Sequence, residues 1–96
     1  MITAGSGTTY VRAEARFGVA EARRLRDALA LLAPVNHLSI DFGSAVHVED
    51  AALSIVAEML GKTDIRSFQL TGLTRHRRRL LRYMGVGREQ GGAIAA

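Results

Sequence analysis

Two neighbouring acids, Glu49 and Asp50, stand where a short polar segment changes into an alanine-rich apolar one. Acids in this place are typical of the first turn of a helix, where outward-pointing backbone N–H groups favour negative charge. An apolar strand expected at 37–42 leads into this helix through a short loop. We therefore expect an exposed acidic turn (residues 49–51), where a partner binds or a side chain is modified.

The candidate partner-binding surface surrounds the acidic turn. Its members are Ser44, His47, Glu49, Asp50, Ala51 and Ala52. Because the two alanines are small, we expect them to let a partner approach closely. Ser44 follows a glycine in the preceding loop, which is typical of a plain turn, although its hydroxyl is also an alternative phosphate acceptor.

An arginine cluster forms the second charged feature. Five arginines lie within residues 75–82 on one expected helix, and we assign Arg75, Arg78, Arg79 and Arg82 to a basic patch. Such a patch can be a solvated face near a helix C-terminus, where cations suit the helix dipole, or can bind an acidic protein, nucleic acid or an anionic membrane. The lack of aromatic residues placed for base stacking and of helix-turn-helix spacing makes nucleic acid unlikely as a partner.

No pattern of residues indicates catalysis. The three histidines, His37, His47 and His76, lack metal-ligand spacing, and the chain has no cysteine. The Gly5-Ser6-Gly7 run precedes a strand instead of linking a strand to a helix, so it does not have the context of a P-loop. We expect a protein that is not an enzyme, with no catalytic residue, no metal and no cofactor.

The length and composition predict a single domain at 1–96, with flexible ends at 1–7 and 87–96, and a short extra strand at 1–3 is an alternative for the first of these ends. A hydrophobic content of 48% is enough for a globular core and argues against disorder. The longest apolar run is too short to span a membrane, and the first residues lack the pattern of a secretory signal. We therefore expect a cytoplasmic protein with no membrane span. The net charge of +4 is compatible with an anionic partner.

Strands and helices alternate along the expected fold. They are strands at 8–17, 37–42 and 65–70 and helices at 18–33, 49–61 and 75–84. This order predicts an α/β fold in which a small, mainly parallel sheet is flanked by helices. Apolar residues cover more than half of the helix at 49–61, so it should be deeply packed in the core or form the contact of a homodimer.

Two motifs within residues 37–86 resemble the STAS family, the sulfate-transporter and anti-sigma-antagonist domains. Ile40-Asp41-Phe42 followed by Val48-Glu49-Asp50-Ala51-Ala52-Leu53 is similar to the family's strand ending in Asp and its Asp-Ser-Ser-Gly-Leu helix start. Leu70-Thr71-Gly72-Leu73-Thr74, with Leu81 to Val86 downstream, is similar to the family's Gly-Leu-Ser and Leu-x-x-x-Gly-Leu elements. The resemblance implies a STAS-like fold.

The resemblance also implies a function. In family members that are anti-sigma factor antagonists, the second serine of the motif is phosphorylated by a kinase that is also the anti-sigma factor. The matching residue here is Ala51, which has no hydroxyl, and Asp50 matches the first serine. We expect a protein-binding, anti-sigma-antagonist-like domain in bacterial signal transduction and transcription regulation, without the usual phosphoacceptor. The sequence leaves open whether Asp50 mimics phosphoserine or only caps the helix.

Two alternative functions stay open. A STAS subunit of a lipid-transport ABC complex would have a similar size and would bind an ATPase subunit through a similar surface. A basic binder of nucleic acid or of an anionic membrane surface would instead use the arginines within 75–82.

Overall fold

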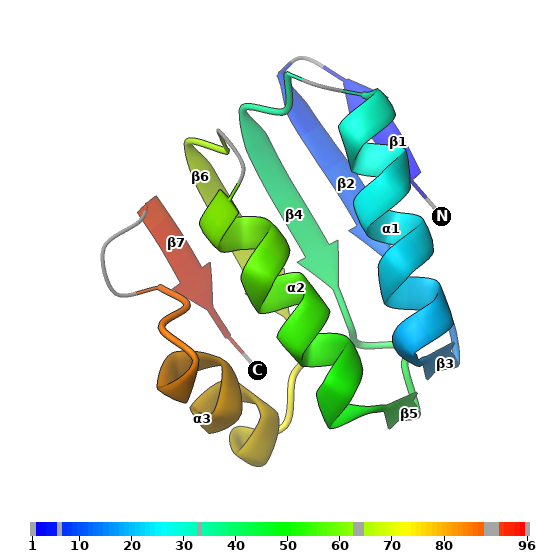
Figure 1. Cartoon of the computed structure of the whole chain (residues 1–96), viewed down its shortest axis with the longest axis vertical. Coiled ribbons are helices and arrows are strands. Elements are labelled where there is room, and N and C mark those ends of the chain that lie inside the picture. The colour runs from blue at the N-terminus through cyan, green and yellow to red at the C-terminus, as the bar shows by residue number, and fades with distance from the viewer. Residues whose placement is uncertain (1, 6, 33, 63–64, 88–90, 96) are drawn as a thin grey trace.

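The computed structural model describes residues 2–5, 7–32, 34–62, 65–87 and 91–95. The elements in chain order are β1 (Ile2–Gly5), β2 (Thr8–Arg12), β3 (Arg16–Phe17), α1 (Val19–Leu31), β4 (His37–Asp41), β5 (His47–Val48), α2 (Asp50–Lys62), β6 (Ser67–Thr71), α3 (Arg75–Tyr83) and β7 (Gly91–Ile94). The main sheet has the order β1-β2-β4-β6-β7, and β3 pairs separately with β5. Within the main sheet only the β1–β2 pair is antiparallel. The predicted α/β architecture is confirmed (Figure 1).

The helices cover one face of the main sheet. Side chains alternate along β2, β4 and β6, so that Val11, Ile40 and Leu70 are buried while Tyr10 and Gln69 are exposed on the opposite face. This period of two follows from the pleat of a strand. Figure 1 shows α1 and α2 lying across the covered face. The opposite face is therefore open to solvent along these three strands.

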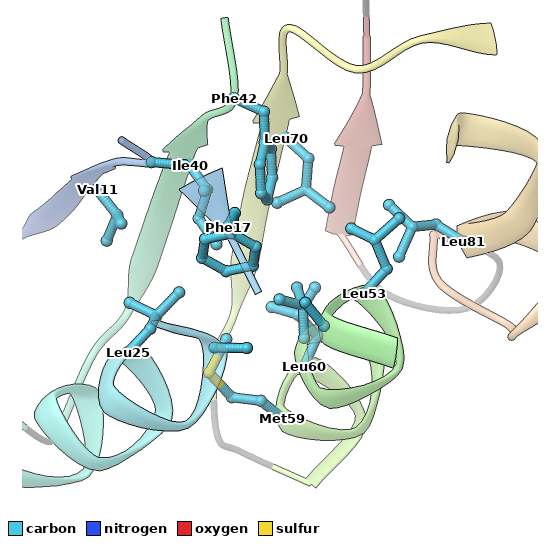
Figure 2. Close-up of a cluster of buried hydrophobic side chains, with 14 of the residues drawn as sticks. Val11, Phe17, Leu25, Ile40, Phe42, Leu53, Met59, Leu60, Leu70 and Leu81 are labelled. Carbon is cyan, nitrogen blue, oxygen red and sulfur yellow. The ribbon is translucent and has the colours of Figure 1, made fainter. Parts of the chain in front are cut away.

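The core lies between α2 and the sheet. Leu53 and Leu60 of α2 are buried with residues of the strands, and Leu81 of α3 lies next to Leu53 (Figure 2). Phe17 and Phe42 meet edge to face, with ring centroids 5.3 Å apart. The broad apolar surface of α2 is thus used inside the chain, which confirms the expectation of deep packing.

The prediction of one continuous strand at 8–17 is wrong, because the structure has two separate strands, β2 and β3, in this segment. The chain leaves the main sheet after Arg12, and Ala15 O then accepts hydrogen bonds from the backbone N–H groups of Val46 and His47. Residues 16 and 17 therefore pair with β5 instead of extending β2. Apolar and polar residues keep alternating along the sequence where the chain passes from β2 to β3, so this pattern cannot show that one strand ends and another begins.

Both chain ends contain strands where we expected flexible segments. β1 pairs with β2, and β7 pairs with β6. Gly92 of β7 has a packing role, because a Cβ at this residue would lie 2.2 Å from Phe68 Cζ. Small residues that suggest flexibility in the sequence thus let β7 pass closely over an aromatic ring.

Within the described part of the chain, each helix is too short or too polar to cross a lipid bilayer.

Candidate functional site

The acidic turn is exposed at the beginning of α2. Glu49, Asp50 and Ala51 all face solvent, and β5 leads into this turn after the loop that follows the central strand β4. Ala52, which we expected on the binding surface, is 0% exposed. The first turn of α2 directs its side chain into the core, so Ala52 does not belong to the exposed surface.

Glu49 joins the starts of two helices. Its Oε2 accepts a hydrogen bond from the backbone N–H of Val19 at 3.3 Å, and its Oε1 accepts one from Arg16 Nη2 at 3.4 Å. Val19 is the first residue of α1, whose early N–H groups have no partner within their own helix. The side chain of Glu49 therefore stabilises the beginning of α1, while its backbone carbonyl accepts from Ala52 and Leu53 at the beginning of α2.

A second carboxylate reinforces the start of α1. Glu21 Oε1 accepts a hydrogen bond from the backbone N–H of Gly18 at 2.8 Å, and Glu21 Oε2 lies 2.6 Å from Arg24 Nη2. Hydrogen bonding to the Gly18 N–H is the largest cause that lowers the pKa of Glu21 below its ordinary value, and the backbone N–H of Glu21 and then Arg24 add to it. The carboxylate is thus stabilised in its charged form beside the acidic turn.

Asp50, in contrast, has only a weak contact. Its Oδ2 lies 3.9 Å from His76 Nε2 on α3, and both side chains are mostly exposed, at 65% and 76%. Exposed pairs at this distance contribute little to stability. Among the described residues none donates a hydrogen bond to Asp50, so its charge is available to a partner.

Ser44, in the loop between β4 and β5, is hydrogen-bonded to the last residue of β2. Its Oγ accepts hydrogen bonds from Arg12 Nε at 3.3 Å and from Arg12 Nη2 at 2.9 Å. Asp41 Oδ1 in turn accepts from the backbone N–H of Gly43 at 2.7 Å. These bonds fix the loop between β4 and β5, which carries the chain to the acidic turn.

Beside the acidic turn lies a polar pocket of about 380 Å³. It is lined by Arg16, His47, Val48, Glu49 and Arg77. The sequence places His47 and Glu49 on the candidate surface, but it gives no sign that Arg16 of β3 and Arg77 of α3 approach the same hollow. Only the tertiary structure brings together residues that are separated by about sixty positions along the chain.

The basic patch is divided by the structure. Arg75, Arg79 and Arg82 are exposed on α3, whereas Arg78 is half-buried and donates from Nη1 to the carbonyl of Leu73 at 3.0 Å. Arg78 therefore holds the connection between β6 and α3. Thr74 caps this helix, since its Oγ1 accepts a hydrogen bond from the backbone N–H of Arg77 at 3.3 Å.

The histidines lie apart from one another. His37 of β4 hydrogen-bonds to Ser67 on the neighbouring strand β6, His47 lines the polar pocket, and His76 faces Asp50. Among the residues described by the structure, no group of three or more His, Cys, Asp or Glu side chains could hold a metal ion.

Comparison with known proteins gives one informative match. No protein-family model and no curated protein matches the chain. A chain of the solved structure on the molecular architecture of the stressosome, a signal integration and transduction hub, is similar with a TM-score of 0.59. The two chains are 19% identical, and the match covers 99% of this chain and 88% of the other. This likeness shows the fold alone: the chain has a STAS-like α/β fold.

Proposed function

We propose that this chain is a non-enzymatic protein-interaction domain that acts like an anti-sigma factor antagonist in a bacterial partner-switching pathway. The observation that carries the proposal is the exposed acidic turn, in which Ala51 faces solvent between a STAS-like strand and helix. The fold supports the proposal, and the similar chain belongs to an assembly described as a signal integration and transduction hub.

The acidic turn divides its two charges between different tasks. Glu49 binds Arg16 and the backbone of Val19, so it holds the turn in place. Asp50 projects a carboxylate into solvent from the first turn of α2. We propose that Asp50 contacts the partner directly, together with Ala51 and His47, and that Ser44 supports the loop from below.

Because Ala51 has no hydroxyl, phosphorylation cannot change the charge of the surface at this residue. Phosphorylation would add about −1.5 to −2 charges to such a turn and change what a partner meets there. Ala51 cannot accept a phosphoryl group, and Asp50 carries a permanent negative charge one residue away. The proposed binding therefore does not respond to a kinase at this position.

A phosphorylation assay tests this prediction. The chain and its Ala51→Ser variant are incubated with ATP and the kinase-type anti-sigma factor of the same organism, and intact masses are measured. We expect no phosphate on the natural chain and one phosphate on Ala51→Ser. A phosphate on Ser44 or on any other residue of the natural chain would contradict the proposal.

Charge reversal tests the role of Asp50. We expect Asp50→Arg to weaken binding to that anti-sigma factor at least about tenfold, because it removes a charge at the proposed contact and opposes the dipole of α2. Asp27→Arg is the matched control, since Asp27 is exposed on α1 about 12 Å along the helix from Val19. If Asp50→Arg lowers the melting temperature but leaves binding unchanged, Asp50 only caps the helix. A complex with a transporter ATPase subunit instead would favour the lipid-transport alternative.

A further inference from the structure

We propose that the polar pocket beside the acidic turn binds a phosphate group, either of a free phosphate compound or of a phosphorylated side chain. The pocket is lined by side chains of three separate elements, with Arg16 from β3, His47 from β5 and Arg77 from α3. Figure 1 shows β3, β5 and the start of α3 at the same end of the molecule. Its volume of about 380 Å³ lies within the range of roughly 300–1,000 Å³ that is typical of small-ligand sites.

The charges of the pocket favour an anion. Two guanidinium groups, Arg16 and Arg77, face one carboxylate, Glu49. That carboxylate already accepts from Arg16 and from the backbone of Val19, so its charge is largely satisfied. Arg77 forms no ion pair with any carboxylate of the described residues. The pocket therefore keeps an excess positive charge.

The arrangement of the arginines favours phosphate over a single carboxylate. An arginine offers a planar fork of N–H donors that fits two oxygen atoms of one anion. Arg16 and Arg77 project from different elements, so their forks can contact different oxygens of a tetrahedral group. Val48, which is buried, provides an apolar floor beneath them, and the open side of the pocket leaves room for the group esterified to the phosphate.

The ligand can come from two sources that share this chemistry, a free phosphate compound or a phosphorylated side chain. The inference goes beyond the proposed function, because the pocket is assigned to a phosphate group and does not depend on binding of an anti-sigma factor to the acidic turn. Its test is therefore made on the isolated chain, and it can fail while partner binding stands, or succeed while partner binding fails.

The first measurement is a titration of the ¹⁵N-labelled chain with inorganic phosphate, O-phosphoserine, serine and acetate. We expect phosphate and O-phosphoserine to shift the amide signals of Arg16, His47, Glu49 and Arg77. A stronger response to O-phosphoserine assigns the site to phosphorylated side chains, and a stronger response to phosphate assigns it to free phosphate. Equal binding of acetate, or signals that move only elsewhere on α3, would overturn the inference.

The second measurement compares two arginines of the same helix. We expect Arg77→Gln to weaken phosphate binding about tenfold, since it removes a charge-assisted hydrogen bond from the pocket. Arg79→Gln removes the same charge from α3 outside the pocket and should weaken binding less than about twofold at moderate salt. The ¹⁵N spectra establish that both variants are folded, and Arg16→Gln provides an independent second test. Equal losses for Arg77→Gln and Arg79→Gln would show only general attraction to a basic helix.

Discussion

Glu49 should contribute more to stability than Asp50, although the two acids are neighbours in the sequence. Replacing Glu49 with Ala removes a hydrogen bond to Val19 N and an ion pair with Arg16. A hydrogen bond to a charged group contributes roughly 1.5–3 kcal/mol, and partial exposure to water brings this toward the lower end. The ion pair adds little, because the Arg16 side chain is 74% exposed. We therefore expect Glu49→Ala to lower the free energy of unfolding by about 1–2 kcal/mol.

Urea denaturation followed by circular dichroism measures this loss. For a domain of this size, about 1–2 kcal/mol corresponds to a decrease of roughly 1 M in the urea midpoint, with an unchanged slope. Glu49→Gln keeps a carbonyl that accepts from Val19 N but has no charge, so it should lose about half as much. Arg16→Gln should cost less than about 0.5 kcal/mol.

Asp50→Ala is the decisive comparison. Among the described residues, Asp50 has only the weak contact with His76 at 3.9 Å, and its interaction with the dipole of α2 contributes about 0.5 kcal/mol. If Asp50→Ala is as destabilising as Glu49→Ala, or if Glu49→Ala has no effect, the link between the starts of α1 and α2 does not hold the acidic turn.

Three further predictions concern the core, a connection and the pH response. Leu53→Ala, at a fully buried residue of α2, should lower the free energy of unfolding by about 3 kcal/mol in urea melts; a loss below 1 kcal/mol would mean that the core is not packed as described. Gly72→Ala should cost at least about 3 kcal/mol or prevent folding, because Gly72 has a φ of +78° and its Cβ would lie 2.3 Å from Gly43 N; a variant with an unchanged melting temperature would contradict this. The lowered pKa of Glu21 means that its contribution is complete above the ordinary value of 4.5 and is lost as the pH falls through the lowered pKa. The difference in stability between the natural chain and Glu21→Gln should therefore shrink in acid, and a difference that is independent of pH would refute this.

The fold was largely predictable from local pattern. The alternation along β2 and the apolar face of α2 depend on neighbouring residues, and they predicted the strand and the buried helix. The start of α3 was predictable because Thr74 caps its own helix. The edge strand β7 was not predictable, because Gly92 packs against a ring on another strand.

The site was predictable only in part. The two acids of the acidic turn stand out in the sequence because a helix start favours them. The role of Glu49 depends on its contact with Val19, which lies about thirty residues away in the sequence. The contact of Ser44 with Arg12 spans a similar separation. Such contacts depend on the pairing of β3 with β5, which a pattern of neighbouring residues in the sequence does not predict. The same is true of Arg77, whose place in the polar pocket depends on how α3 packs against α2.

The open face of the main sheet has a consequence for how this chain can evolve. Tyr10, Ser39 and Gln69 lie side by side across β2, β4 and β6, and no helix packs over them. Substitutions along this row should be nearly neutral, whereas each neighbour on the covered side is confined by tight packing. Mutations can therefore accumulate on one surface of the sheet while the architecture persists.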